Sequence, residues 1–199
     1  MADVTTEIQK LYVAYFNRPA DPAGLAFWSA ALAGNSGAYE GIVRDFAKSQ
    51  EYLVGYNGYT NRSAIDLIYQ HLFGRNAEQA GVDYWASLLD RKTLTIDTIV
   101  AAMVQGAQGS DKVVLDGRVA VATAFTNHID TVAERLAYSG AVANSVASQY
   151  LSTVVDAQTA ATALLPENID AVITKLPGPV VIPLAGTSAE LVGVPPAHG

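Results

Sequence analysis

The sequence predicts an all-α protein in which tandem three-helix repeats pack as a helical bundle or short solenoid. Alanine is frequent whereas Phe and Trp are few, which is typical of helices that pack closely through small side chains. A thirteen-residue pattern also occurs twice, as FNRPADPAGLAFW at 16–28 and as FGRNAEQAGVDYW at 73–85, 57 positions apart. Stacked structural units are commonly copied in this way.

The first helix of each repeat is predicted from apolar residues that recur at i, i+3, i+4 and i+8, the spacing of one helix face. These residues are Ile8, Leu11, Tyr12 and Phe16 in the first copy, and Ile65, Ile68, Tyr69 and Phe73 in the second.

A loop that begins with Asn17 in one copy and with Gly74 in the other is expected to end this helix, because both residues adopt the left-handed conformation readily. The next residue, Arg18 or Arg75, can reach the open carbonyls of the last helical turn. We therefore expect both arginines to be structural.

The second helix is predicted to start at Asp21-Pro22, where the carboxylate caps free backbone N–H groups and proline needs no donor. Glu78 occupies the first of these positions in the second copy and is a weaker cap. Gly24 and Gly81 lie inside this helix, where glycine costs about 1 kcal/mol relative to alanine. Their repetition predicts that another backbone passes close by.

Aromatic pairs, Phe27-Trp28 and Tyr84-Trp85, follow as predicted anchors, with Trp28 and Trp85 facing inward. A third helix completes each repeat, and its apolar residues also match at the offset of 57. These are Ile42, Val43 and Phe46 in the first copy, and Ile99, Val100 and Met103 in the second.

The repeats are predicted to span about 7–60 and 64–116 within a region 1–116, followed by degenerate capping helices over 117–175. We expect one long helix over 117–139, with Phe125, Ile129, Val132 and Leu136 on one face, and two short helices at 145–155 and 166–176. Residues 176–199 contain five prolines, which predicts an extended linker or tail.

Composition excludes several classes of function. The formal net charge is −7 without a basic stripe, so nucleic acid is not an expected partner. The absence of cysteine excludes disulfides and thiolate chemistry. Neither a secretory signal nor a run of about 18 apolar residues that could span a bilayer is found. His71, His128 and His198 are isolated, and with no catalytic motif beside them we expect no enzyme.

The connector between the repeats, YLVGYNGYTN at 52–61, provides the candidate ligand-binding residues. Aromatic faces edged with amides can stack on sugars and form hydrogen bonds to them, although the tyrosines can equally fold onto the core. The predicted polysaccharide site consists of Tyr52, Tyr56, Asn57, Tyr59 and Asn61.

Asp21 with Asn17, and Glu78 with Asn76, offer oxygen atoms that could bind Ca²⁺. Each loop offers few acids for a cation that takes 6–8 oxygen ligands. Helix capping is the favoured interpretation, and no metal or other cofactor is expected in this domain.

The pattern LYVAYFNRPADPAGLAFW, its copy IYQHLFGRNAEQAGVDYW and the spacer SQEYLVGYNGYTNRSAID resemble the DUF4214 family of bacterial proteins over about residues 7–130. That family's signature includes an S-x-E-[FY] element, here Ser49-Gln50-Glu51-Tyr52. The second copy departs from the signature at Glu78 and at GAQG, residues 106–109.

The resemblance implies a place in large secreted proteins of Gram-negative bacteria, among them S-layer and RTX-type adhesins exported by type I secretion, in which calcium can bind the full-length protein or lattice. It further implies a non-enzymatic domain that anchors the protein to the cell surface through lipopolysaccharide O-antigen polysaccharide. The alternatives are a structural spacer, self-association within a surface lattice, and an enzyme that acts on glycans.

Overall fold

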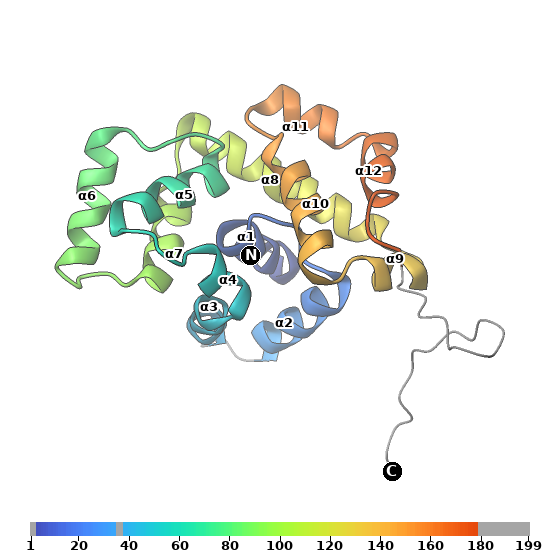
Figure 1. The fold of residues 1–199 in the computed structure, drawn as a ribbon, viewed down its shortest axis with the longest axis horizontal. Helices are drawn as coiled ribbons and strands as arrows, with labels where there is room; N and C mark the ends of the chain where they lie inside the picture. The colour runs from blue at the N-terminus through green and yellow to red at the C-terminus, as the bar shows by residue number, and fades with distance from the viewer. Residues whose placement is uncertain (1–2, 35–37, 179–199) are drawn as a thin grey trace, which may run out of the picture.

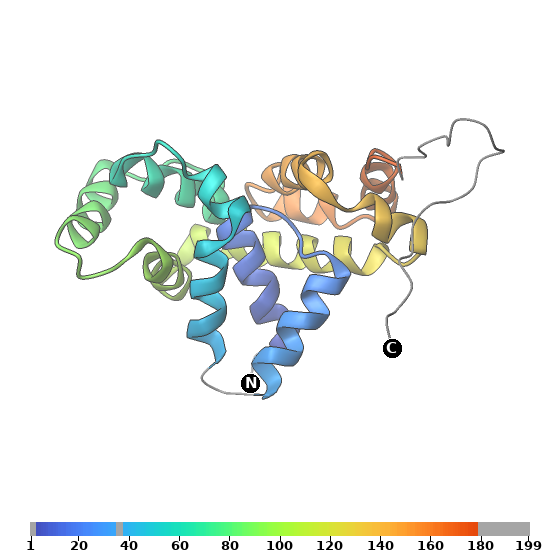
Figure 2. The same ribbon diagram turned by 60° about the horizontal axis from the view of Figure 1, so that its bottom comes forward.

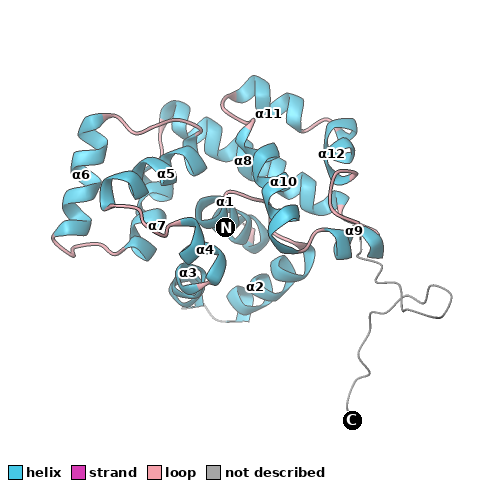
Figure 3. Ribbon diagram, viewed as in Figure 1, coloured by secondary structure: helices cyan, strands magenta, loops and turns pink. Residues whose placement is uncertain are grey.

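The computed structural model describes residues 3–34 and 38–178, and within these ranges it contains twelve helices and no strand (Figure 3). The all-α prediction is confirmed. Most of the predicted Pro-rich tail, residues 179–199, lies outside the described residues.

The first copy of the repeat forms four helices, α1 (Val4–Phe16), α2 (Pro22–Gly34), α3 (Ala38–Lys48) and the short α4 (Gln50–Gly55). The second copy forms three helices, α5 (Asn61–Phe73), α6 (Gln79–Asp90) and α7 (Ile96–Gly106). The remaining helices are α8 (Gly109–His128), α9 (Val132–Ala137), α10 (Gly140–Ser152), α11 (Ala157–Ala163) and α12 (Pro166–Ile173).

The long helix α8 joins the parts of the fold. It contacts α1 and α5, the first helices of the two copies, and also α10, α11 and α12. Figure 2 shows it running lengthwise beneath the C-terminal helices α10, α11 and α12, while α1 crosses it and the hairpins α2–α3 and α6–α7 project away from it. Figure 1 places α1 near the centre, between the second copy and the C-terminal helices.

The repeated motif builds one tyrosine-centred unit per copy. A Cβ atom added at Gly24 would collide with the Tyr12 hydroxyl, and one added at Gly81 would lie 3.3 Å from the Tyr69 hydroxyl. The glycines therefore make room for a tyrosine side chain, and the prediction of a passing backbone was wrong. In the second copy the Trp85 indole also donates a hydrogen bond to Tyr69 at 3.2 Å.

Several local predictions are confirmed. Asn17 and Gly74 end α1 and α5 in the left-handed conformation, with φ of 51° and 68°. Asp21 accepts the backbone N–H of Gly24 at 2.7 Å, as expected of a cap. Glu78 makes no such capping bond. The matched residues of α3 and α7 that were predicted to face inward are all buried.

Only one residue of each aromatic pair is an anchor. Trp28 and Trp85 are half-buried and pack against the core, whereas Phe27 and Tyr84 are 64% and 58% exposed. Neighbouring residues on a helix point about 100° apart, so both members of a pair cannot face the same core.

The predicted helix over 117–139 is broken in the structure. α8 starts earlier, at Gly109, and ends at His128, and Thr131 then caps α9 by accepting the Glu134 N–H at 3.2 Å. The break changes the helix phase, so that Val132 and Leu136 are 71% and 56% exposed instead of inward-facing.

Three helices, α10, α11 and α12, occupy the region where two were expected. The short α11, of sequence AQTAATA, has no long apolar periodicity. It begins where Asp156 accepts the Thr159 N–H at 2.7 Å.

Candidate ligand-binding groove

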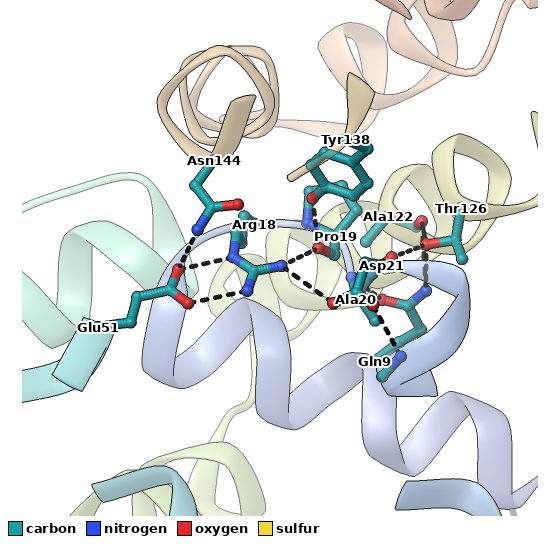
Figure 4. Close-up of polar contacts among 11 residues, drawn as sticks. Gln9, Arg18, Pro19, Ala20, Asp21, Glu51, Ala122, Thr126, Tyr138 and Asn144 are labelled. Atoms are coloured by element: carbon teal, nitrogen blue, oxygen red, sulfur yellow. Dashed lines mark hydrogen bonds and ion pairs between the residues drawn. The ribbon is translucent and has the colours of Figure 1, made fainter. Parts of the chain in front are cut away.

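The arginine of the first copy joins two elements that are distant in sequence. The buried Arg18 forms a two-point contact with Glu51 of α4, with Nε to Oε1 at 2.6 Å and Nη2 to Oε2 at 2.8 Å (Figure 4). Its Nη1 donates to the carbonyl of Pro19, in the loop itself. The arginine is structural as expected, but it pairs with a carboxylate and does not cap the carbonyls of the last turn of α1.

The second copy repeats this contact with a different partner. Arg75 binds Asp111 of α8 through two hydrogen bonds of 2.8 Å, and it also contacts Glu78 at 2.7 Å. The first turn of α8 thus takes the role that α4 has in the first copy.

A buried polar network holds the 17–21 loop against α8. Gln9 donates to Thr126 Oγ1 at 2.7 Å and accepts the Ala20 N–H at 3.1 Å, while Thr126 donates to the Ala20 carbonyl at 2.7 Å (Figure 4). In the second copy Asp66 accepts the Ala77 N–H at 3.2 Å. Gln9 and Asp66 occupy corresponding positions at the offset of 57, and each is a polar residue on an otherwise apolar helix face. This correspondence is the feature of the sequence that could have predicted the contact with the loop.

α10 is tied to both α1 and α4. Asn144 donates to Glu51 Oε1 at 3.1 Å, and Asn17 donates to Ser148 and Ser152 at 3.0 Å each. These contacts fix the separation of the three helices around the groove described next.

A groove of about 560 Å³ lies between the C-terminal end of α1, α4, α5 and α10. Its aromatic lining comes from Tyr15, Phe16, Tyr56 and Tyr59. Its polar lining comes from Asn17, Gln50, Glu51, His71, Asn144, Ser145 and Ser148. Of these lining residues only Glu51 carries a formal charge at neutral pH, and that charge is paired with Arg18.

The residues predicted as a polysaccharide site divide into two groups. Tyr56 and Tyr59 line the groove, and Tyr59 is 48% exposed. Tyr52 is buried beneath Tyr56, with the ring centroids 4.2 Å apart and the planes inclined by 26°. Asn57 is exposed and does not line the groove, and Asn61 donates to Asp90 of α6 at 2.6 Å. Two of the five residues therefore meet at one surface.

His71 joins the groove from α5, and its position was not foreseen from the sequence. Burial and, to a smaller extent, the nearby charge of Arg118 lower the pKa of His71 to about 4. A hydrogen bond with the Ala14 backbone raises this pKa, but its effect is smaller. The imidazole is therefore neutral at physiological pH. Within the described part of the chain, the buried His71 Nδ1 and the Tyr56 hydroxyl have no hydrogen-bond partner.

The side chains weighed as calcium ligands have other roles: Asn17 binds the α10 serines, Asp21 caps α2 and Glu78 pairs with Arg75. Across the described ranges, no three His, Asp or Glu side chains gather as metal ligands would. The described helices also include none with the length and apolar character needed to cross a bilayer.

Comparison with known families finds one match. The model of the Domain of unknown function (DUF4214) matches residues 2–56 and 45–111, which together cover more than half of the chain. No curated protein and no solved structure matches the chain.

Proposed function

The chain belongs to the DUF4214 family, and we propose that it is a non-enzymatic domain that anchors a secreted bacterial surface protein, of the S-layer or adhesin type, to lipopolysaccharide O-antigen polysaccharide. The observation that carries the proposal is the groove beside α4, in which aromatic rings and neutral polar groups lie together.

The chemistry of the groove suits a sugar. The apolar C–H face of a pyranose can stack on the Tyr59 ring, which is partly exposed and next to Tyr56. The amides of Gln50 and Asn144 and the hydroxyl of Ser145 border this aromatic surface and can form hydrogen bonds to ring hydroxyls.

The groove lies beside the first of the two copies of the motif. In the first copy α4 follows α3 and supplies Gln50, Glu51 and Val54 to the wall, and Tyr56 follows directly after α4. In the second copy the first turn of the long helix α8 takes the place of α4, and within the described residues no separate short helix lies between α7 and α8. Features shared by both copies are explained by packing, whereas the groove depends on what the copies do not share.

Replacing Tyr59 with alanine is expected to weaken binding of purified O-polysaccharide from the source organism about tenfold, the equivalent of about 1.4 kcal/mol for a lost stacking contact. Asn57→Ala is the matched control, because Asn57 is exposed in the same connector and lies outside the groove. Titration calorimetry measures both affinities. Wild-type affinity in a folded Tyr59→Ala variant would remove the groove from the binding site.

A spacer or lattice contact is the second candidate function, favoured by the exposure of Phe27 and Tyr84 at equivalent positions of the two copies. Sedimentation velocity over a range of protein concentrations distinguishes it. Self-association that Phe27→Ser and Tyr84→Ser abolish, in a protein that does not bind the polysaccharide, would favour this alternative.

A further inference from the structure

A second hollow adjoins the groove. It has a volume of about 360 Å³ and lies between the start of α2, the end of α9 and the start of α10. Its lining includes Arg18, Asp21, Ala23 and Tyr138. Asn144 lines both this hollow and the groove, so the two depressions meet at the first turns of α10.

The boundary between the two depressions is a row of three side chains. Asn144 donates to Glu51, and Glu51 binds Arg18 through both carboxylate oxygens (Figure 4). Glu51 lines the groove, whereas Arg18 lines the second hollow. These contacts fix the row, because the Asn144 amide nitrogen and both Glu51 carboxylate oxygens are engaged in it. The planar amide of Asn144 lies at the point where a ligand would cross.

The charges on the two sides of this row balance. Arg18 is neutralised by Glu51 at 2.6 Å and by Asp21 at 3.9 Å. Arg135 lines the second hollow, is exposed, and donates to the Asp130 carbonyl at 2.8 Å. Among the described lining residues the buried cation, Arg18, is therefore paired with carboxylates, whereas the charge of Arg135 has no carboxylate partner and lies in solvent at the exposed rim.

We propose that the groove and the second hollow form one continuous binding site for an extended, uncharged oligosaccharide, which crosses the row of Asn144, Glu51 and Arg18. The proposal rests on the proposed function and adds to it the length and charge class of the ligand. The sugars at one end of the oligosaccharide would occupy the groove beside Tyr59, and further units of the same chain would occupy the second hollow.

The test uses the whole chain and size-fractionated fragments of the O-polysaccharide of the source organism, from one repeating unit upward. Wild-type affinity, measured by titration calorimetry, is expected to rise about tenfold once fragments are long enough to reach the second hollow. Raising the salt concentration from 0.05 to 0.5 M, in round figures, is expected to change the affinity less than about twofold, because no ion pair with the ligand is screened.

Ala23→Trp places a large side chain at an exposed position of α2 that lines the second hollow. It should remove the tenfold gain for long fragments and leave the shortest fragment unaffected. Ala30→Trp, at an exposed position of the same helix that lines neither depression, is the control and should behave as wild type.

The outcomes separate the two proposals. If no fragment binds to the wild-type chain, the proposed function fails and this inference fails with it. If fragments bind but affinity does not depend on their length, only the continuous site is overturned, whether or not Ala23→Trp folds. Strong weakening of binding by salt would overturn the assignment of an uncharged ligand.

Discussion

Replacing Arg118 with leucine is expected to lower the free energy of unfolding by about 3–5 kcal/mol, because backbone carbonyls in the core lose their charged donor. Arg118 is 1% exposed and donates from Nε to the Val154 carbonyl at 2.9 Å. Its Nη1 donates to the carbonyls of Gln70 and His71 at 2.7 and 2.5 Å. These acceptors lie at the end of α5 and just after α10, so one side chain joins both elements to α8.

The cost arises because leucine leaves the carbonyls of His71 and Val154 without the donor that Arg118 supplies, at about 1–3 kcal/mol for each unsatisfied group, whereas the Gln70 carbonyl keeps the Gly74 N–H at 3.2 Å. Part of this loss of stability is offset, because the leucine variant does not have to bury a charge. The cost of burying that charge also lowers the pKa of Arg118 to about 10. Lysine keeps the charge but lacks the planar fork of donors, so Arg118→Lys should fall between the two.

Urea denaturation at neutral pH measures the effect. Arg44→Leu, at an exposed position of α3, serves as the control and should change stability by less than about 0.5 kcal/mol. An Arg118→Leu variant with the wild-type midpoint would show that the carbonyls find other partners and that α8 does not depend on this residue.

The folded protein is expected to lose about 3 kcal/mol of stability through His71 alone as the pH falls from about 6.5 to about 4. Burial, and then the charge of Arg118, lowers the pKa of His71 from 6.5 in a model peptide to about 4 in the fold. Between these values the unfolded chain binds a proton at His71 and the folded chain does not. Protons therefore favour unfolding in this window, and the full stability is present only above it.

His71→Gln isolates this contribution, because glutamine does not titrate and retains a donor for the Ala14 carbonyl. Chemical denaturation of both proteins at pH 7 and pH 4 gives the two differences in free energy. Wild type should lose about 3 kcal/mol more than His71→Gln over this interval. Equal losses in the two proteins would mean that His71 is protonated freely in the folded state.

Local sequence patterns predicted the helix faces and helix caps, because these features depend on residues close together in the chain. Ile8, Leu11 and Tyr12 recur at helical spacing and are buried in α1, and Asp21 caps α2 as a residue of its type does elsewhere. The offset of 57 also identified Gly24 and Gly81 as constrained. What the offset could not show was the constraining group, a tyrosine hydroxyl from the preceding helix.

The remaining features depend on contacts between distant segments. Arg18 and Glu51 are 33 residues apart, and Asn144 reaches Glu51 across 93 residues. No periodicity encodes such pairs. The sequence predicted the connector tyrosines, of which Tyr56 and Tyr59 line the groove, but it did not predict that α10 and His71 line it too. The apolar spacing over 117–139 conceals the helix break before Val132, although Thr131 and Glu134 have the spacing of a capping box in the sequence.

The most direct test of the central claim, that one groove beside α4 binds the polysaccharide, is a chemical-shift map of the ¹⁵N-labelled chain titrated with O-polysaccharide fragments from the source organism. We expect the shifted amides to cluster at Glu51–Tyr59 in and after α4, at His71 of α5 and at Ala141–Ser148 of α10. Shifts confined to the exposed faces of α2 and α6, around Phe27 and Tyr84, or no shifts at saturating fragment, would contradict it.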